Sequence, residues 1–475
     1  MSGIKAKICV IGAGPAGLAA AYELVQHGTT DVIVIDRHEM VGGLARTVSS
    51  PGDGARFDIG PHRYFTKNAE VKALWFRLLG DDFITVSRTT RIFYRGKLFN
   101  YPIKAGDVLI KLGIWSSFLS FLSYIRERII PRRNIRTFED WVTAKFGGRL
   151  YRTFFKYYTE KVWGIPCSEI EARWAAQRIK GLNFTEVVKK VFGGTAKAKS
   201  LVESFYYPRK GAGQMYEAMA DVITKAGGRV MLATEVMSYQ LESDRLVSLE
   251  VKDAAGNLST ITADHFFNSA PITAFFERLS VPPPPAVAEA CKQLYYRAHI
   301  TVNMLVEGTD LFPDQWIYIH DPSFQMARLA NYNNFASDMV EKSGFTAVSA
   351  EYFTFEHETL WKMDDEALMQ LAVEEVRRLG LVGTSKVKGV SVIRERESYP
   401  TYFMGYEQPF NVLKDHLDRI RNVSPVGRGG LYKYNNQDHS IYSGLVAVRN
   451  YLFPDHHMSV WQINIDAEYQ EEEYE

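Results

Sequence analysis

The chain is short of cysteine, with only Cys9, Cys167 and Cys291 among its 475 residues. These three residues are far apart and have no metal-ligand spacing, so neither a disulfide framework nor a zinc site is expected. Such sparse use of cysteine is typical of a reducing compartment, and no secretory signal precedes the first apolar strand. We therefore expect a cytoplasmic protein without a bound metal.

An excess of either charge is also lacking. Lys and Arg total 56 and Asp and Glu total 55, which gives a formal net charge of +1. Because binding to a nucleic acid rests on excess positive charge, a nucleic-acid partner is not expected. The 46% apolar content is that of an ordinary globular protein, and the length favours two or three lobes.

An uninterrupted apolar run that could cross a bilayer, which takes about 20 residues, is missing too. Residues 108–125 come nearest, but Lys111 interrupts them. Small residues that favour close packing recur there at helical spacing, namely Gly113, Ser116, Ser117, Ser120 and Ser123. We expect a helix that is buried or lies at a homo-oligomer interface. A basic run follows, at Arg126, Arg128, Arg132, Arg133 and Arg136, and it leaves contact with a membrane surface open.

A nucleotide-binding pattern is present in residues 7–36. A short apolar strand leads into Gly12, Gly14 and Gly17 in GxGxxG spacing, then into a helix rich in Ala and Leu and a second apolar strand, Val32 to Ile35. Glycines at this spacing allow a tight turn, close approach of a pyrophosphate and close packing of helix on strand. Asp36 follows the second strand and is expected to accept a ribose hydroxyl. The complete strand, turn, helix and strand order predicts a dinucleotide site.

The next segment favours FAD over NAD. MVGGLARTV, residues 40–48, resembles the extended fingerprint of the glutathione-reductase-like FAD family. Segments 227–236, 263–271 and 427–452 resemble later parts of the same family. The resemblance implies an FAD site formed by Gly12, Gly14, Pro15, Ala16, Gly17, Asp36, Arg37, Gly43, Leu44, Ala45, Arg46, Gly60, Pro61, His62, Val236, Arg428, Asn436, Gln437 and Ser440.

The fold class implied by this resemblance is α/β, with a glutathione-reductase-like FAD-binding Rossmann domain, a mixed-sheet substrate domain and a helical insertion. The expected FAD-binding domain comprises residues 1–65, 206–270 and 401–465. The expected mixed α/β substrate domain comprises residues 66–104 and 271–400. Residues 105–205 would form the helical insertion, and residues 466–475 an acidic tail.

Within the FAD families the chain resembles the UDP-galactopyranose mutases, with protoporphyrinogen and amine oxidases as more distant relatives. The resemblance rests on FDIGPHRYF (57–65), RIFYRGKLFNYP (91–102), EKVWGIPCSEIEARWAAQRI (160–179) and NQDHS (436–440), in that order. It implies reduced FAD whose N5 acts as a nucleophile on a nucleotide-activated sugar. The pyranose and furanose forms would interconvert without net redox change.

The mutase resemblance also implies roles for particular residues. His62 and Arg63 would lie beside the flavin, and Arg178 would bind the pyrophosphate. Diphosphate-binding tyrosines fall at Tyr399 and at Tyr432 or Tyr434. The family's second arginine aligns with Gln325, and Arg328, three residues later, is the other candidate for that position.

Two departures from the mutases keep other functions open, namely Gln325 at the second arginine position and Pro61. Pro61 stands where the mutases have a second glycine, and proline restricts the rearrangement of that loop. Gly-Pro at this point is more like the oxidase and desaturase relatives. The alternative is therefore a redox flavoenzyme, an oxidase, dehydrogenase or desaturase with an apolar substrate. A non-catalytic flavin-binding regulator is a third hypothesis.

Overall fold

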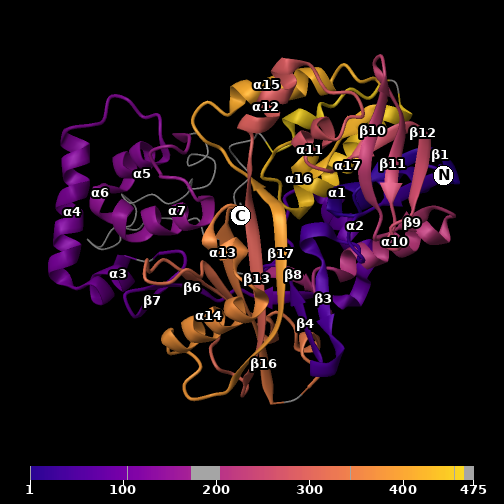
Figure 1. Ribbon diagram of the computed structural model, residues 1–475. Helices are drawn as coiled ribbons and strands as arrows, with labels where there is room; N and C mark the ends of the chain where they lie inside the picture. Colours follow the sequence, from indigo (N-terminus) through magenta and orange to yellow (C-terminus); the bar gives the residue numbers. More distant parts are fainter. Residues whose placement is uncertain (1, 104, 173–203, 343, 454, 465–475) are drawn as a thin grey trace.

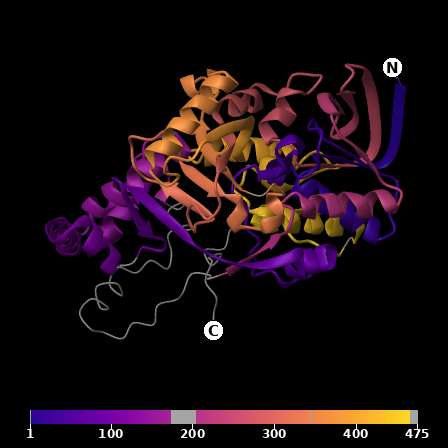
Figure 2. The same ribbon diagram turned by 90° about the horizontal axis from the view of Figure 1, so that it is seen from below.

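The fold has two large β-sheets and a helical part (Figure 1). The computed structural model describes residues 2–103, 105–172, 204–342, 344–453 and 455–464. In Figure 1 the first sheet lies on the right, the second in the centre and the helical part on the left. Figure 2 shows that the helical part projects away from the two sheets.

The first sheet has seven strands and contains the predicted nucleotide-binding pattern. Its central strands β1 and β2 are parallel, and β2 covers the four residues predicted from the sequence, all of them buried. Such short, fully buried runs of Val and Ile are typical of parallel strands. The strands are β10 (Glu235–Glu242), β11 (Arg245–Lys252), β12 (Leu258–Asn268), β1 (Ser2–Ile11), β2 (Val32–Ile35) and β9 (Arg229–Met231) in spatial order, with β18 (Val423–Pro425) beside β12.

Helices cover both faces of this sheet. Alternate residues of β1 belong to different cores, with Val10 in one and Cys9 in the other, because successive strand residues point to opposite faces. On the side of Val10 pack α1 (Pro15–Gln26), α2 (Ala69–Leu79), α10 (Gln214–Lys225) and α17 (Gln437–Leu452). On the side of Cys9 pack α11 (Ile272–Glu277), α12 (Pro285–Gln293) and α15 (Glu407–Leu417).

The second sheet is mixed and also has seven strands. The long strands β13 and β17 pair over most of their length, and helix α14 (Asp365–Arg378) packs on an apolar core made with β13, β14 and β16. In spatial order the strands are β17 (Val387–Pro400), β13 (Tyr296–Glu307), β16 (Phe345–Thr354), β15 (Arg328–Asn331), β14 (Trp316–Ile319), β6 (Thr90–Tyr94) and β7 (Lys97–Asn100). Strands β6 and β7 pair antiparallel as a hairpin, which includes most of the segment RIFYRGKLFNYP (91–102).

Short elements complete the framework around the sheets. Strands β3 (Thr47–Ser50) and β4 (Ala55–Asp58) form one antiparallel pair, and β5 (Phe83–Ser87) and β8 (Ser204–Pro208) form another. Helix α13 (Thr359–Lys362) follows β16, and α16 (Gly427–Gly430) precedes α17. The predicted α/β class with a mixed second sheet is confirmed.

The helical part contains the apolar segment that stood out in the sequence. Its elements are α3 (Ala105–Leu112), α4 (Ile114–Ile129), α5 (Phe138–Phe146), α6 (Gly148–Tyr151), the π-helix η4 (Arg152–Lys156) and α7 (Tyr157–Trp163). The expectation of one buried helix is wrong, because the helix breaks at Gly113 and several large apolar side chains of α4 are exposed, whereas a homo-oligomer interface at this helix stays a prediction. Within the described ranges, no helix combines the length and the hydropathy needed to cross a membrane.

Candidate functional site

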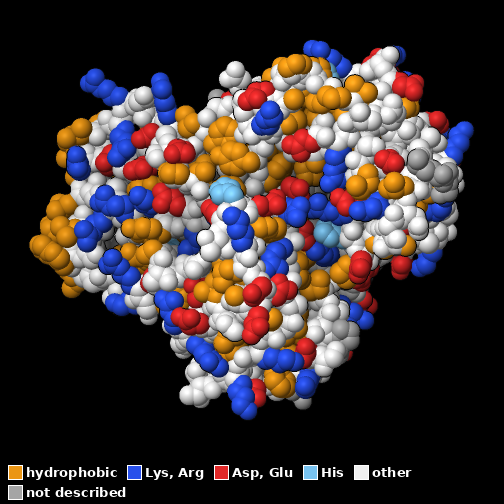
Figure 3. Space-filling model, in the orientation of Figure 1, with side chains coloured by type: hydrophobic (Ala, Val, Ile, Leu, Met, Phe, Trp, Pro, Cys, Tyr) orange, Lys and Arg blue, Asp and Glu red, His pale blue; other side chains and the backbone are white. Residues whose placement is uncertain are grey.

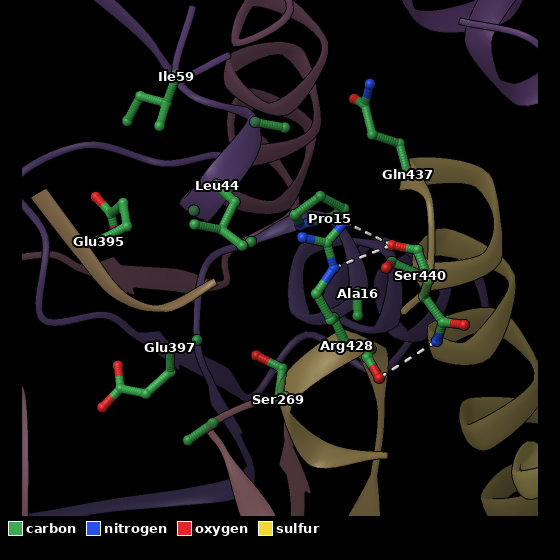
Figure 4. A pocket seen from close by; sticks show the side chains of 18 of the residues that line it. Pro15, Ala16, Leu44, Ile59, Ser269, Glu395, Glu397, Arg428, Gln437 and Ser440 are labelled. Atoms are coloured by element: carbon green, nitrogen blue, oxygen red, sulfur yellow. Dashed lines mark hydrogen bonds between the residues drawn. The ribbon is translucent and has the colours of Figure 1, made fainter. Parts of the chain in front are cut away.

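A pocket of about 480 Å³ is lined by residues of both sheets and of the loops between them. The amino-terminal end of α1, the carboxyl end of β2, the loop after β4 and the segment from α16 to α17 contribute from the first sheet's side. Strands β14, β15 and β17 contribute from the second sheet. In Figure 4, Glu395 and Glu397 lie on one side of the pocket and Gln437 and Ser440 on the opposite side.

The glycine turn at the start of α1 leaves no room for larger residues. Gly12 has a φ of +99°, and a Cβ on Gly17 would lie 1.9 Å from the Gly12 carbonyl oxygen. Pro15 occupies the first turn of α1, and the amino-terminal end of this helix lines the pocket. Such a helix end favours an anion, because its first amides have no partner within the helix. Gly17 supports this turn but is not among the described residues that line the pocket.

Asp36 lies at the end of β2, where the pattern predicted it. Its carboxylate accepts hydrogen bonds from the Ala13 amide at 2.6 Å and the His38 amide at 2.8 Å. Burial raises the pKa of Asp36, and the two amide bonds act in the opposite direction. A carboxylate has about four acceptor positions, so two bonds leave capacity for a ribose hydroxyl. Arg37, which forms an ion pair with Glu397 at 3.0 Å, and Val236 line the same end.

Arg46 differs from its expected position. Its guanidinium donates to the Gly43 carbonyl at 2.8 Å and forms an ion pair with Glu395 of β17. The side chain is buried and is not among the described lining residues, whereas its neighbours Leu44 and Ala45 are. Arg46 therefore stabilises the turn at Gly43 and connects it to the second sheet, and its contact with the cofactor stays a prediction.

The loop with His62 forms one wall of the pocket. Gly60, with a φ of +81°, Pro61, His62 and Arg63 all line it. His62 Nε2 lies 2.8 Å from the Leu44 carbonyl oxygen and 3.1 Å from the Ile59 carbonyl oxygen. Both partners are acceptors, so Nε2 carries the proton. Burial lowers the pKa of His62 to about 4, which makes the ring neutral at pH 7.

A buried ionic cluster lies directly behind this loop. Arg328 of β15 lies 2.5 Å from Glu351 of β16, and His299 of β13 lies 3.0 Å from the same carboxylate oxygen. A Cβ on Gly60 would come within 2.9 Å of that oxygen. Burial acts to raise the pKa of Glu351, but attraction to Arg328 and the bond with His299 outweigh it, so the pKa is lowered.

Of the two candidates for the second arginine position, the structure brings Arg328 to the pocket. Gln325 is exposed, and its backbone amide donates to Glu375 at 2.5 Å. The two residues differ because β15 begins at Arg328, after an irregular segment that carries Gln325.

Two stacked tyrosines and an arginine form a further part of the wall. The rings of Tyr399 and Tyr434 are 5.1 Å apart, and the Arg428 guanidinium lies 5.0 Å and 4.9 Å from their centroids. Arg428 is held by the Asn435 and Ser398 carbonyl oxygens. The candidate Tyr432 lies elsewhere. Its buried hydroxyl donates toward the Tyr295 and Thr401 carbonyl oxygens, away from the pocket.

The start of α17 completes the pocket on the side opposite Glu395. Asn436 caps the helix through a capping box, and Gln437 accepts a hydrogen bond from the Tyr216 hydroxyl at 2.5 Å. Asn436, Gln437 and Ser440 all line the pocket, and Figure 4 shows Ser440 near Arg428, Pro15 and Ala16. Arg178, the remaining candidate, lies outside the described residues.

Several lining residues have no counterpart among the sequence-based candidates. Trp316 and Tyr318 of β14 and Glu395 and Glu397 of β17 face the pocket, and Glu351 lies behind it. Trp316 and Tyr318 are of residue types that are common in strands, so nothing in the sequence indicated that they line a pocket. Glu351 did stand out in one respect, because it is a carboxylate inside an otherwise buried strand.

The whole arrangement fits an extended dinucleotide cofactor. One end has the glycine turn, the α1 amino terminus and Asp36, which suit a diphosphate and a ribose. The other end has the His62 loop and the tyrosine pair, where aromatic and peptide surfaces could flank a ring system. Gly14 and Gly43 face each other in the wall, with a Cβ on Gly43 only 3.1 Å from the Gly14 Cα.

Known proteins resemble this chain in sequence over part of its length. A Klebsiella pneumoniae protein named "Probable UDP-galactopyranose mutase" is 29% identical over 171 residues, which is 35% of this chain and 43% of that protein. The chloroplastic protoporphyrinogen oxidase of Oryza sativa subsp. japonica is 24% identical over 199 residues, 41% of this chain and 37% of that protein. Each match thus spans less than half of the relative's length.

Solved structures resemble it over nearly the whole length. Reduced UDP-galactopyranose mutase has a TM-score of 0.81 and 19% identity, covering 95% of this chain and 96% of that chain. Putrescine oxidase bound to putrescine has a TM-score of 0.60 and 14% identity, covering 94% of this chain and 99% of that chain. Identities this low establish a shared fold alone.

The match to a protein family covers more of the chain than either of the two sequence relatives above. Residues 15–432 match the family described as flavin containing amine oxidoreductase. That description implies a flavin cofactor, and the dinucleotide pocket fits FAD. The predicted relationship to the amine oxidases is therefore confirmed, and the chain belongs to the flavin-containing amine oxidoreductase family.

Proposed function

We propose that this protein is an FAD-dependent enzyme that acts on a nucleotide-activated sugar and interconverts its pyranose and furanose forms. The match with 29% identity and the fold shared with reduced UDP-galactopyranose mutase support this proposal. A bound flavin supplies, when reduced, a nucleophilic ring nitrogen for covalent catalysis without net redox change. The substrate class and the reduced state are both part of the proposal.

The observation that carries the proposal is a group of arginines beside the tyrosine pair of the pocket. Arg63, Arg328 and Arg428 line it together with the tyrosines Tyr399 and Tyr434. Arginine is suited to a diphosphate because its guanidinium keeps its charge and offers paired donors.

Arg328, the two tyrosines and His62 each have a task in the proposed reaction. Arg328, oriented by Glu351, would bind the diphosphate, and the Tyr399 and Tyr434 hydroxyls would donate to its oxygens or to the sugar. Burial raises the pKa of Tyr399 to about 12, so its hydroxyl keeps its proton. Neutral His62, bonded through Nε2 to Leu44, would fix the loop beside the cofactor.

The test uses the purified holoprotein reduced with dithionite under nitrogen. A panel of UDP-, GDP- and dTDP-sugars is added, and the flavin spectrum and the sugar ring form are recorded. We expect thermal protection by at least one nucleotide sugar and ring interconversion only with reduced protein. Arg328→Gln should abolish the protection, while Arg419→Gln, at an exposed position, is the control. Lack of protection by every sugar would contradict the proposal.

A redox flavoenzyme is the second candidate, and Pro61 favours it. Proline fixes the backbone next to Gly60, which restricts the loop rearrangement expected of a mutase. Under this alternative a substrate should bleach the oxidised flavin, and an electron acceptor should restore its colour. Pro61→Gly separates the two functions, since the freed loop should help a mutase and bring no gain to an oxidase.

A further inference from the structure

Helix α4 turns its large apolar side chains away from the protein. Ile114 is 86% exposed, Trp115 72%, Phe118 48% and Leu122 46%. These residues recur at helical spacing along one side of α4, and Ile129 continues the same side. Trp115 and Phe118 also contact each other, with ring centroids 5.9 Å apart. A folded protein rarely exposes a contiguous set of side chains of this size without a binding role.

On the side of α4 that faces the protein, the buried residues are small or polar. Ser117, Ser120 and Tyr124 are its buried residues. Close packing occurs where α4 meets the turn before α6, since a Cβ on Gly147 would lie 2.8 Å from the Tyr124 amide nitrogen. The sequence prediction of close packing through small residues therefore holds. The large apolar residues are not needed for that contact, and they remain on the outer side.

Positive charge accompanies the exposed apolar residues. Residues 104–136 include seven Lys and Arg but only two acidic residues, whereas the whole chain is balanced. The five arginines that follow or end α4 are all exposed, namely Arg126, Arg128, Arg132, Arg133 and Arg136, and of these Arg132 forms ion pairs with Glu127 and Asp140. Figure 3 shows hydrophobic side chains gathered over α4 at the left edge of the molecule, with Lys and Arg side chains beside them.

We propose that this region, which we call the α4 surface, binds an anionic lipid membrane. The α4 surface comprises Ile110, Ile114, Trp115, Phe118, Leu122, Ile129 and Ile130 with the five arginines named above. A helix with Trp, Phe and Leu on one side and arginines nearby lies in the membrane interface and inserts its apolar side chains among the acyl chains. The arginines add attraction to anionic headgroups. This proposal does not depend on the catalytic function.

A second copy of the chain fits the α4 surface less well. In a two-fold symmetric dimer the same patch meets itself, so the excess positive charge of residues 104–136 would face an equal charge. An anionic bilayer offers the opposite charge and an apolar layer together. The outermost position of α4, seen in Figures 1 and 2, also leaves room for contact with a flat surface.

The test is flotation of the full-length holoprotein with vesicles. Vesicles of phosphatidylcholine alone are compared with vesicles of phosphatidylcholine and phosphatidylglycerol at a 7:3 ratio. We expect binding to the anionic vesicles that weakens as salt is raised, and little binding to the neutral ones. Brominated acyl chains should quench part of the tryptophan fluorescence, and this quenching should decrease in Trp115→Phe.

Two paired variants test the two parts of the surface. Trp115→Ser with Phe118→Ser should lower the partition coefficient more than about tenfold, because two apolar side chains no longer insert. Arg126→Ser with Arg133→Ser should lower it about 30-fold on the anionic vesicles. The control for the apolar pair is Val281→Ser, and the control for the arginine pair is Lys292→Ser with Lys386→Ser. All three positions are exposed and lie outside α4.

Retained flavin absorbance and an unchanged melting temperature verify that each variant is folded. The proposal is overturned if the wild type does not bind anionic vesicles, or binds neutral ones equally well. It is also overturned if the α4 variants and the controls bind alike. A wild-type dimer that Trp115→Ser with Phe118→Ser dissociates, without any vesicle binding, would assign the α4 surface to a second copy.

Discussion

Arg328 and Glu351 form an ion pair inside the protein, with Arg328 Nη2 2.5 Å from Glu351 Oε2. The Glu351 side chain is fully buried, and that of Arg328 is 17% exposed. Because Arg328 lines the pocket and Glu351 lies behind Gly60, the pair connects the second sheet to the loop beside the cofactor site. The arginine is therefore fixed before any substrate arrives.

The first prediction concerns the coupling within this pair. Glu351→Gln leaves the largely buried Arg328 guanidinium without its counter-charge, and we expect the free energy of unfolding to fall by about 3–5 kcal/mol. Arg328→Gln should also be destabilising. The double variant should lose clearly less than the sum of the two single losses, because it leaves no unpaired charge. Urea unfolding of the four proteins measures this, and simple additivity would show that the two residues act separately.

The second prediction separates crowding from backbone strain at Gly60. Gly60→Ala places a Cβ 2.9 Å from the Glu351 carboxylate at a φ of +81°. Gly256→Ala is the matched control, since its φ is +84° and nothing lies within 4 Å of its Cβ. The control should lose about 1–2 kcal/mol through the backbone alone. Gly60→Ala should lose more and also release flavin, as measured by the absorbance of the purified protein. Equal losses would mean that the Glu351 contact is unimportant.

Local patterns allowed the first part of the fold and of the site to be predicted. Gly12 to Asp36 form one continuous segment. Its glycine spacing and its apolar strand pattern can therefore be recognised in the sequence without knowledge of long-range contacts. Strand β2 was therefore predicted to the residue, and Asp36 lies where expected. The domain boundaries stay predictions. The role of Arg178 also stays a prediction, since Arg178 falls outside the described residues.

Long-range pairing explains what the sequence could not reveal. Glu351 meets His299 because β13 and β16 pair antiparallel, with Thr301 opposite Glu351, and no local pattern encodes that register. Arg46 lies beside Glu395 only because β17 approaches the turn at Gly43. The spacing of apolar residues in α4 shows that the helix has an apolar side. It does not show whether this side packs against α6 or faces outward, so its exposure could not be predicted.

The third prediction distinguishes two tyrosines that are two residues apart. The Tyr432 hydroxyl lies 3.0 Å and 3.1 Å from two backbone carbonyl oxygens, whereas Tyr434 lines the pocket. Tyr432→Phe should lower the free energy of unfolding by about 1 kcal/mol and leave ligand affinity unchanged. Tyr434→Phe should weaken ligand binding and change stability little. Thermal unfolding and ligand titration of both variants measure this, and reversed effects would mean that Tyr432 is the ligand-binding residue.

The last prediction is a loss of stability in acid that depends on His320. This ring is buried, stacks on Tyr158 at 4.5 Å and is near Tyr318 and Lys161. Burial lowers the pKa of His320 to about 3, and the charge of Lys161 acts in the same direction. Below a pH of about 6.5 the unfolded chain therefore binds a proton that the folded protein does not.

The free energy of unfolding should thus fall as the pH drops from 6.5 toward 3, by about 1.4 kcal/mol per pH unit from this residue alone. His320→Gln removes the titrating group, so the slope between pH 6 and pH 4.5 should become shallower by about that amount. His357→Gln, at an exposed position, is the control. Urea unfolding at four pH values supplies the slopes, and an identical slope for His320→Gln and wild type would show that His320 takes up its proton equally in both states.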